Sequence, residues 1–285
     1  MQMIKDKGSF QQICRVWRFS GLKTALVPTM GYFHQGHLSL MSYAKSAADK
    51  CIVSLFVNPT QFGPNEDLEA YPRDHERDAE AAERAGADLL FIPEHGDVYA
   101  PDHATWIEVP PLSAHLCGKS RPTHFRGVAT IVAKLFNLAT PSLAVFGQKD
   151  WQQLAIIKKM VRDLDMAVQV VGRPIIREED GLAMSSRNAY LTPEERKAAP
   201  MLHQGLLEAQ RLVERGVVQA REIIRGVSEF YAENLPQGEL DYLELVDPDR
   251  IEPVQKVENQ ALLATAMRLG RARLIDNLLL SGTRA

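Results

Sequence analysis

Short apolar runs alternate with longer amphipathic stretches through the first two thirds of this 285-residue chain. The apolar runs, which have the length and composition of buried strands, span 25–27, 51–57, 89–92, 143–146 and 168–171. The stretches between them, whose apolar residues recur at helical spacing, span 38–48, 74–85, 127–138 and 151–164. Strand and helix in alternation predict an α/β fold with a doubly wound, mainly parallel sheet.

The pattern changes after residue 188, where helices come first and strands follow. Thr192 can cap a helix in which Pro193 is the first residue and Glu195 the third. Helices are predicted at 193–215 and 219–234, and strands at 241–246, 261–267 and 272–276. This order predicts a separate, smaller α+β domain. The boundary is placed near Ser185, which gives domains 1–184 and 185–285.

Composition disfavours two classes of partner. The formal net charge is −3 and the 33 Lys and Arg residues are dispersed, so no basic face for nucleic acid is indicated. The charged start of the chain does not fit a signal peptide, and no apolar run has membrane length.

Cys14, Cys51 and Cys117 lie far apart in sequence, so we expect them to pack in the core of a cytoplasmic protein.

One strand-to-helix junction draws attention first. The apolar run before it breaks at PTMG (28–31), and a helix then opens on HQGH (34–37). We expect the strand before this junction to lie near the amino-terminal edge of the sheet. The junction itself would lie beyond the carboxyl end of that strand, where open α/β sheets bind ligands. The first turn of a helix attracts phosphate, so the segment indicates nucleotide handling.

Four residues of this junction suit an anion. Gly31 and Gly36 let the backbone approach a ligand closely. His34 and His37 are three residues apart, so both rings can face one phosphate and donate to it. Two alternatives stay open, namely a helix cap with a packed ring, and half of a zinc site, for which the segment offers no third ligand.

The segment FVNPTQF (56–62) follows another predicted strand. Gln61 offers both a donor and an acceptor, which suits a hydroxylated carboxylic acid in a pocket above the sheet. A solvated loop residue is the alternative, and this segment alone favours it.

The segment FGQKDWQQ (146–153) also joins a strand to a helix. Gly147 allows close approach, Lys149 can neutralise phosphate, and Asp150 can cap the helix or reach a hydroxyl or hydrated magnesium. Gln153 lies three residues further, on the same helical face as Asp150. An ordinary capped helix with an exposed lysine is the alternative.

The segment DGLAMSSRN (180–188) has little regular pattern but concentrates small donors and one arginine. Two hydroxyl groups and a guanidinium can grip a polyphosphate, and a mobile loop of this composition could close over a nucleotide. A plain interdomain linker is the alternative.

The loop GKSRPTHFRG (118–127) holds four potential cations before a helix. Ser113 stands where a P-loop needs its first glycine, so the P-loop is rejected and only a weak anion contact is expected.

Taken together, PTMG with HQGH, FVNPTQF, RPTHFRG (121–127), FGQKDWQQ and DGLAMSSRN resemble the pantothenate synthetases in order and spacing over essentially the whole chain. The resemblance implies a cytoplasmic homodimer with a Rossmann-like amino-terminal domain and a smaller carboxy-terminal lid, which we expect to close before chemistry. It implies that pantoate and ATP give pantoyl adenylate and pyrophosphate, and that β-alanine then displaces AMP. Mg²⁺ would accompany the ATP, and no protein side chains are predicted as metal ligands.

The resemblance also implies site residues by position. The ATP site would comprise Met30, Gly31, Tyr32, Phe33, His34, Gln35, Gly36, His37, Gly147, Gln148, Lys149, Asp150, Ile176, Met184, Ser185, Ser186 and Arg187. Among these, the groups that neutralise the departing pyrophosphate would be His34, His37, Lys149, Ser185, Ser186 and Arg187.

Individual roles are implied in the same way. His37 would be the proton donor and His34 a phosphate contact. Gln61 and Gln153 would hold pantoate, with Gln61 also near β-alanine. Asp150 would contact the ribose.

The remaining implied roles concern the adenine and the phosphates. The backbone of Ile176 would contact adenine, and the segment 184–187 would grip the phosphates.

The chain departs from the family pattern at four positions beside the residues with individual roles. The family pattern has Leu at Phe33, usually Glu at Gln35, and more often Glu and Tyr at Gln148 and Trp151. The neutral Gln35 removes a negative charge beside the histidines.

Three rival functions remain for these motifs. A nucleotidyltransferase would keep the nucleotide on its product, and an aminoacyl-tRNA synthetase-like protein would need a basic tRNA-binding domain. A non-catalytic nucleotide-binding protein would bind ATP without pyrophosphate exchange.

Overall fold

The computed structural model describes residues 1–64 and 66–282. The chain divides into two compact units. The first contains Met1–Val109, Thr123–Gln148 and Ile156–Pro174, and the second contains Pro110–Pro122, Lys149–Ala155 and Ile175–Ala285. The division into domains 1–184 and 185–285, with the second as a lid, stays a prediction.

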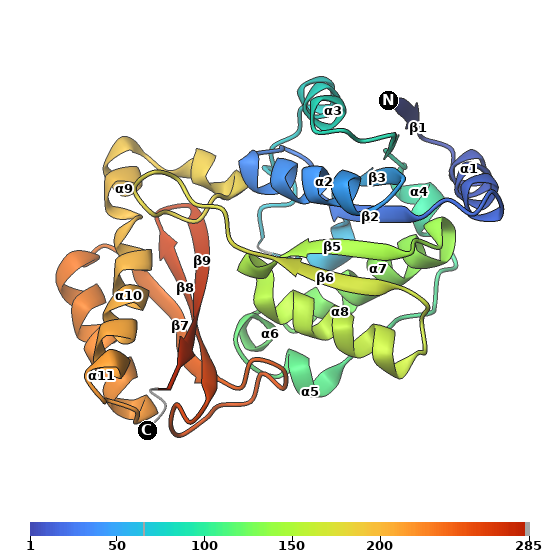
Figure 1. Cartoon of the computed structure of the whole chain (residues 1–285). Helices are drawn as coiled ribbons and strands as arrows, with labels where there is room; N and C mark the ends of the chain where they lie inside the picture. The colour runs from blue at the N-terminus through green and yellow to red at the C-terminus, as the bar shows by residue number, and fades with distance from the viewer. Residues whose placement is uncertain (65, 283–285) are drawn as a thin grey trace. The chain divides into compact units, whose positions relative to one another are not determined.

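The first unit is built on a six-stranded sheet in which every neighbouring pair is parallel. Its strands, in spatial order, are β1 (Gln2–Ile4), β4 (Leu89–Phe91), β3 (Lys50–Leu55), β2 (Thr24–Thr29), β5 (Leu143–Gly147) and β6 (Gln169–Arg173) (Figure 1). The predicted α/β fold with a doubly wound, mainly parallel sheet is confirmed.

The strand order reverses between β2 and β5. From β2 the chain moves outward to β3 and β4, and it then returns to place β5 on the other side of β2, with Ala25 opposite Leu143. Crevices at such reversals are where open α/β sheets bind ligands. The ends of β2 and β5 are therefore where a ligand is expected to bind in the first unit.

The predicted position of β2 near an edge of the sheet is wrong. The strands β5 and β6 lie on one side of it, and it pairs with both β3 and β5. The short strand β1 forms an edge instead, because it pairs with β4 alone. Pairing across helical crossovers decides this order, and chain order does not reveal it.

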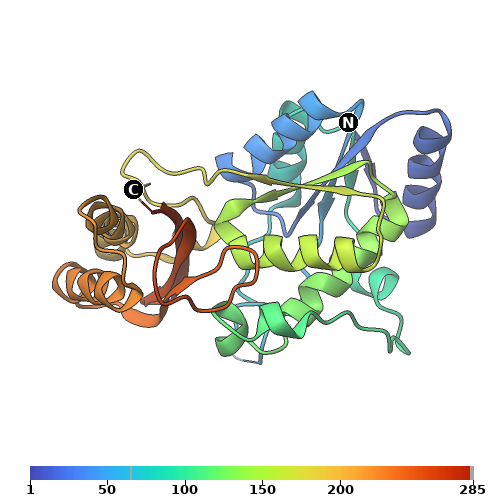
Figure 2. The ribbon, with the colours of Figure 1, turned by 60° about the horizontal axis from the view of Figure 1, so that its bottom comes forward.

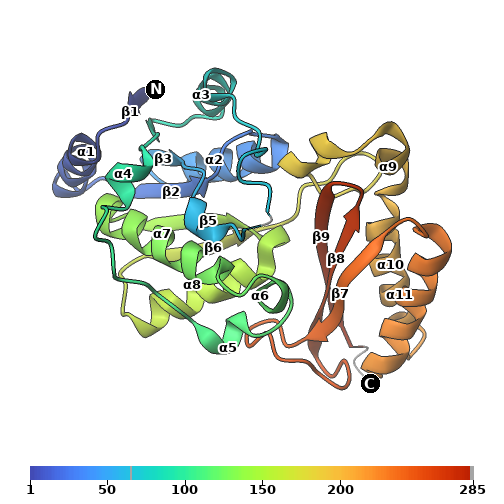
Figure 3. The same ribbon diagram turned by 180° about the vertical axis from the view of Figure 1, so that it is seen from behind.

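Helices cover both faces of this sheet (Figures 1 and 3). They are α1 (Lys7–Phe19), α2 (Gln35–Ala47), α3 (His75–Arg84), α4 (His95–Val98), α7 (His124–Ala139) and α8 (Trp151–Asp163), whose first turn belongs to the second unit. Leu90 packs in one core cluster with Met41 of α2 and Ala82 of α3. Phe91, which points to the opposite face, stacks on Phe10 of α1 with ring centroids 4.0 Å apart.

The amino-terminal strand and helix carry no counterpart in the sequence prediction. The start of α1 does have a local signal, since Asp6 caps the helix by accepting a hydrogen bond from the backbone N–H of Ser9 at 2.6 Å. The strand β1 has only three residues, too few for a periodic pattern.

The second unit contains an antiparallel three-stranded sheet together with helices. The strands are β7 (Glu239–Val246), β8 (Gln260–Leu269) and β9 (Ala272–Ser281). The helices are α5 (Pro110–Ser113), α6 (Cys117–Ser120), α9 (Pro193–Ala198), α10 (Met201–Glu214) and α11 (Ala220–Asn234). Figure 2 shows α10 and α11 side by side, and their apolar faces share one core with the sheet. The predicted α+β character of the carboxy-terminal part is confirmed.

The predicted single helix 193–215 is wrong, because the structure holds two helices there. The capping box of Thr192 and Glu195 is present at the start of α9. Pro200 then separates α9 from α10, since proline has no backbone N–H and its ring clashes with the preceding turn.

Cys14, Cys51 and Cys117 are buried and form no disulfide, so their predicted place in the core is confirmed. Within the described part of the chain, none of the helices has the length and apolar character needed to cross a membrane.

Candidate active site

The turn after β2 places two histidine rings against each other. His34 is the N-cap of α2, and its Nδ1 accepts a hydrogen bond from the Gly36 backbone N–H at 3.1 Å. The Nδ1 of His37 accepts in turn from the His34 backbone N–H at 3.4 Å. The ring centroids lie 4.1 Å apart. The Nδ1 atom of each ring therefore acts as a helix cap, which agrees with the helix-cap alternative for that nitrogen.

These caps determine which nitrogen of each ring can donate. A nitrogen that accepts a hydrogen bond carries no proton, so the neutral rings of His34 and His37 carry theirs on Nε2. The two Nε2–H groups are thus the donors that this turn offers to an anion.

Gln61 is buried, so the alternative of a solvated loop residue is wrong. It ends the short 3-10 helix Pro59–Gln61 (η1) after β3. Its Nε2 donates to the sulfur of Met30 at 3.0 Å, and its Oε1 accepts from the Asn58 side chain at 3.3 Å. Two predicted site residues from different strand ends, Met30 and Gln61, are therefore in contact.

The start of α7 packs directly on this 3-10 helix. Asn58 also donates to the main-chain oxygen of Gly127 at 3.1 Å, and Nδ1 of His124 lies 2.9 Å from the main-chain oxygen of Gln61. A side chain at Gly127 would place its Cβ 2.6 Å from the backbone of Thr60. The segment RPTHFRG thus supports the 3-10 helix that carries Gln61 through contacts of Gly127 and His124.

The end of β5 supplies two predicted site residues to the first unit. Gly147 is the last residue of β5, and Gln148 begins the 3-10 helix Gln148–Asp150 (η2). Since β5 pairs with β2, both residues follow the strand on the other side of the reversal in strand order.

The second unit holds Lys149 in a charged surrounding. Burial lowers the pKa of the Lys149 amine and Arg187 lowers it further, whereas the carboxylates of Asp150 and Asp276 raise it. Lys149, Asp150 and Arg187, which are three predicted ATP-site residues, are therefore close enough to influence one another. An anion with several charges would favour the ammonium form of this amine.

The segment that contains Ile176 and Met184 is a hairpin, so the alternative of a plain linker is wrong. The backbone N–H of Met184 donates to the Ile176 oxygen at 3.0 Å, and Arg177 and Ala183 form a bridge. Gly181, at the tip, has a φ of +93°.

The hairpin is tied to β9 by an ion pair. Arg177 donates to both oxygens of Asp276, at 2.7 and 3.0 Å, and it also donates to the Gly181 oxygen at 3.1 Å. Only 2% of the Asp276 side chain is exposed. A bidentate pair of this kind fixes direction as well as distance.

Directly after the hairpin, Ser185 caps a short 3-10 helix, Ser186–Tyr190 (η3). Its hydroxyl accepts a hydrogen bond from the Arg187 backbone N–H at 3.3 Å, and Ser186 is buried. Asn188 donates to the Ala183 oxygen at 3.2 Å, which closes the segment on itself. The serines and the arginine of the predicted phosphate-gripping segment thus lie on one ordered turn.

The predicted residues at the start of α8 have mixed surroundings. Asp150 is exposed and Gln153 is partly buried. Gln152 is buried and donates to the main-chain oxygens of Leu112 and His115, which is a structural task.

The departures from the family pattern are accommodated locally where the structure shows them. Phe33 is buried in the core beside α2. Trp151 donates from its indole nitrogen to the Pro248 oxygen at 2.8 Å.

The predicted site residues are divided between the two units. Those in the first unit are Met30, Gly31, Tyr32, Phe33, His34, Gln35, Gly36, His37, Gln61, Gly147 and Gln148. Those in the second unit are Lys149, Asp150, Gln153, Ile176, Met184, Ser185, Ser186 and Arg187. Within each unit the structure brings several of them into contact, and their roles stay predictions.

Sequence reasoning did not single out Asn58, Asp276 or Asn277. The signal for the last two was present, because an Asp-Asn pair interrupts an otherwise apolar run at 274–280. Buried polar groups in a strand need partners, and these partners lie on segments of the predicted site.

Comparison with known proteins points to one family. The model of the family described as pantoate-beta-alanine ligase matches residues 2–279. A protein named pantothenate synthetase from Nitratidesulfovibrio vulgaris (strain DSM 19637 / Miyazaki F) is 59% identical over 282 residues, which cover 99% of this chain and 100% of that relative.

Two solved structures are similar over nearly the whole chain. The pantothenate synthetase of Thermus thermophilus has a TM-score of 0.91 and 43% identity, covering 98% of this chain and 99% of that one. The pantoate-beta-alanine ligase of Francisella tularensis, solved with beta-gamma ATP and beta-alanine, has a TM-score of 0.80 and 33% identity, covering 98% and 97%.

Proposed function

From the premise that this chain belongs to the pantoate-beta-alanine ligase family, we propose which of its residues bind the substrates and how they carry the reaction. The chain is an ATP-dependent ligase that forms pantothenate from pantoate and β-alanine. The observation that supports the assignment of roles best is the close pair of rings of His34 and His37 at the reversal in strand order, with both Nδ1 atoms used as caps.

In this proposal the turn 30–37 binds the phosphates of ATP. The Nε2–H groups of His34 and His37 donate to phosphate oxygens, and His37 is the proton donor where negative charge develops during transfer. Because Gly31 and Gly36 have no side chain, the backbone can approach the nucleotide closely at these two positions. Gly147 and Gln148, at the end of the neighbouring strand, contact the same nucleotide.

Pantoate binds at Gln61 and Gln153. The Gln61 amide is buried and held by Met30 and Asn58, so its orientation is fixed before the substrate arrives. A fixed amide can accept from a hydroxyl group of pantoate and donate to its carboxylate. Gln61 also contacts β-alanine in this proposal.

The residues of the second unit bind the rest of the nucleotide. Asp150 contacts the ribose, and the backbone of Ile176 contacts adenine. Lys149 and the turn of Ser185, Ser186 and Arg187 neutralise the departing pyrophosphate, with the guanidinium gripping two oxygens at once.

The chemistry then needs positioning and charge neutralisation. A carboxylate oxygen of pantoate attacks the α-phosphorus of ATP, and the bond to pyrophosphate breaks to leave pantoyl adenylate. The amine of β-alanine attacks the acyl carbon, AMP leaves, and the amine loses a proton. Both reactants of the first step are anions, so donors around the phosphates lower its barrier. No covalent bond to the protein forms.

Three further assignments are part of the proposal. Mg²⁺ would enter the site together with ATP and would supply positive charge near the phosphates. The chain acts as a homodimer, as expected from the resemblance. It acts in the cytoplasm, where its three cysteines without disulfides suit a reducing compartment.

The test is an assay in which ATP, pantoate and β-alanine are each omitted in turn. We expect pantoate-dependent exchange of labelled pyrophosphate into ATP without β-alanine, and AMP release at full rate only when β-alanine is present. Exchange that requires β-alanine would overturn the adenylate intermediate. A product that retains the nucleotide would favour the nucleotidyltransferase function.

A further inference from the structure

The backbone just before His34 is held in an unusual conformation. Gly31 has a φ of +88° and Tyr32 a φ of +52°, both in the left-handed region. Glycine adopts this region freely, but a tyrosine does so only where surrounding contacts hold it. The turn therefore needs a group outside itself that stabilises it.

Asp78 of α3 is that group. One carboxylate oxygen accepts from the Tyr32 backbone N–H at 2.6 Å, and the other accepts from the Phe33 backbone N–H at 2.7 Å. The residue is 1% exposed. A buried carboxylate with both oxygens on successive N–H groups fixes the direction of the backbone between them.

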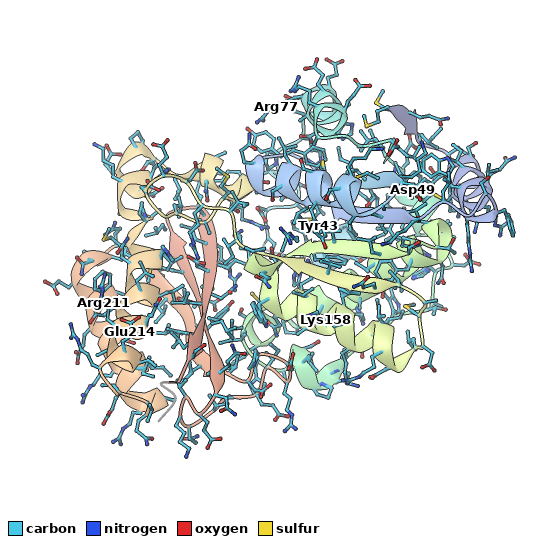
Figure 4. All side chains as sticks on the ribbon, in the orientation of Figure 1. Tyr43, Asp49, Arg77, Lys158, Arg211 and Glu214 are labelled. Atoms are coloured by element: carbon cyan, nitrogen blue, oxygen red, sulfur yellow. The ribbon has the colours of Figure 1, made fainter. Side chains whose placement is uncertain are left out.

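Arg77, the residue before Asp78, contacts the same turn. Its guanidinium lies 4.9 Å from the centroid of the Tyr32 ring, and it donates to the Phe33 oxygen at 3.5 Å. Figure 4 shows Arg77 projecting from α3. Arg77 and Asp78, near the start of α3, thus contact two backbone N–H groups, one carbonyl oxygen and one aromatic ring of the same short turn.

The glycine at position 31 is what lets the carboxylate approach. A Cβ there would lie 2.9 Å from the Asp78 oxygen and 3.1 Å from the Leu55 side chain. Contacts this short require movement of the carboxylate and of the Leu55 side chain. Gly31 is therefore matched to Asp78 in space as well as in backbone conformation.

The held segment leads directly into the two histidines. Phe33 is buried, and its ring lies 5.6 Å from that of His37. The next residue, His34, begins α2 and accepts from Gly36. The direction in which α2 starts, and with it the direction of both rings, follows from where Asp78 places the backbone at 32–33.

We propose that Asp78 is a positioning residue of the ligase, which holds the turn 31–33 so that His34 and His37 keep their Nδ1 caps and present Nε2–H to the substrate. This inference rests on the proposed roles of the two histidines. Burial raises the pKa of Asp78, while the Phe33 and Tyr32 N–H groups lower it, as expected of an acceptor that these donors stabilise.

The test compares two substitutions on the same helix. Asp78→Asn keeps the size but turns an NH₂ group toward a backbone N–H. We expect the rate of pantoate-dependent pyrophosphate exchange at saturating substrates to fall about tenfold or more, the lower range for loss of a positioned donor. Asp74→Ala is the matched control, because Asp74 caps α3 by accepting from the Arg77 N–H and does not contact the turn. It should leave the rate per folded molecule within about twofold.

A second measurement reads the histidines directly. In the unsubstituted protein the imidazole ¹⁵N signals of His34 and His37, assigned with His34→Gln and His37→Gln, should show unprotonated Nδ1 and protonated Nε2. Asp78→Asn should shift these signals toward a mixture of tautomers, and Asp74→Ala should not. If Asp78→Asn fails to fold, Gly31→Ala serves instead, because its Cβ displaces the same carboxylate.

The outcomes separate this inference from the function on which it rests. Imidazole signals or exchange rates that Asp78→Asn leaves unchanged would overturn the positioning role. Full activity of a His37→Ala protein would instead overturn the proposed role of the histidine, whatever the spectrum of the Asp78 variant shows.

Discussion

The side-chain amide of Asn277 donates a hydrogen bond to the main-chain oxygen of Lys149 at 2.9 Å, although 128 residues separate the two. The neighbouring Asp276 holds Arg177 of the hairpin at the same time. One pair of adjacent residues on β9 therefore fixes two segments of the predicted ATP site within the second unit. Both contacts are partly buried, so solvent screens them less than it screens a surface interaction.

Asp276→Asn should lower the free energy of unfolding by about 3 kcal/mol, because it leaves the Arg177 guanidinium without its carboxylate in a largely buried place. It should also raise the KM for ATP, since the hairpin with Ile176 and Met184 loses its anchor. Urea unfolding and steady-state kinetics measure the two effects.

The control for this substitution is Glu208→Gln, which breaks the pair that Glu208 forms with Arg211 on α10. Exposed pairs contribute at most about 1 kcal/mol, so stability should change little. Equal losses in the two variants would contradict the anchoring role of Asp276.

His37→Ala should keep the fold but reduce adenylate formation about a hundredfold or more, the scale for one lost transition-state donor. Pyrophosphate exchange measures this rate, and circular dichroism checks the fold. His75→Ala is the matched control, because His75 is exposed at the start of α3. Near-normal exchange by His37→Ala would remove His37 from the proton-donor role.

Gly127→Ala should move the short 3-10 helix with Gln61, because the new Cβ would lie 2.6 Å from the backbone of Thr60. Overpacking of this kind costs about 1–3 kcal/mol of stability. The KM for pantoate should rise more than the KM for ATP, which steady-state kinetics with each substrate varied would show. Gly96→Ala is the control, since nothing lies near its added Cβ.

If Gly127→Ala raised both KM values equally, or neither, the proposed contact between Gln61 and pantoate would lose its support. A change that appeared equally in Gly96→Ala would point to a general effect of added side chains.

Stability should fall as the pH rises above about 9, in part because of Cys51. Burial raises the pKa of the folded Cys51 thiol to about 12, above the ordinary value of 9.0. The unfolded thiol therefore loses its proton first, and the stabilisation present below pH 9 is lost as the pH rises toward 12. At pH 10 the loss is about 1.4 kcal/mol for this thiol.

Urea unfolding at pH 8 and pH 10 measures the effect as a difference. The drop between the two pH values should be smaller in Cys51→Ala than in the unsubstituted protein by about that amount. Cys14→Ala should behave alike, since burial raises the pKa of Cys14 to about 12 as well. Identical drops in all three proteins would contradict burial of the thiols as the cause.

Most elements of the fold could be predicted from local pattern. The strands 89–92 and 143–146 and the helix 151–164 are predicted within a few residues of their observed bounds. Strands buried on both faces read as short continuous apolar runs, and a helix buried on one face shows a helical period. The predicted helix at 193–215 was wrong where Pro200 interrupts it, although proline is itself a sequence signal. The strand β1 was too short to show any period.

The sequence by itself determined the α/β class, the carboxy-terminal α+β part and the motifs that carry the family resemblance, since all of these reside in local composition and spacing. Only the tertiary structure decided that β2 lies inside the sheet, that Gln61 is buried against Met30, and that Asp78 holds the backbone before His34. These contacts join segments many residues apart. Their partners are selected by packing and by the need of buried polar groups for hydrogen bonds, and a linear pattern records neither.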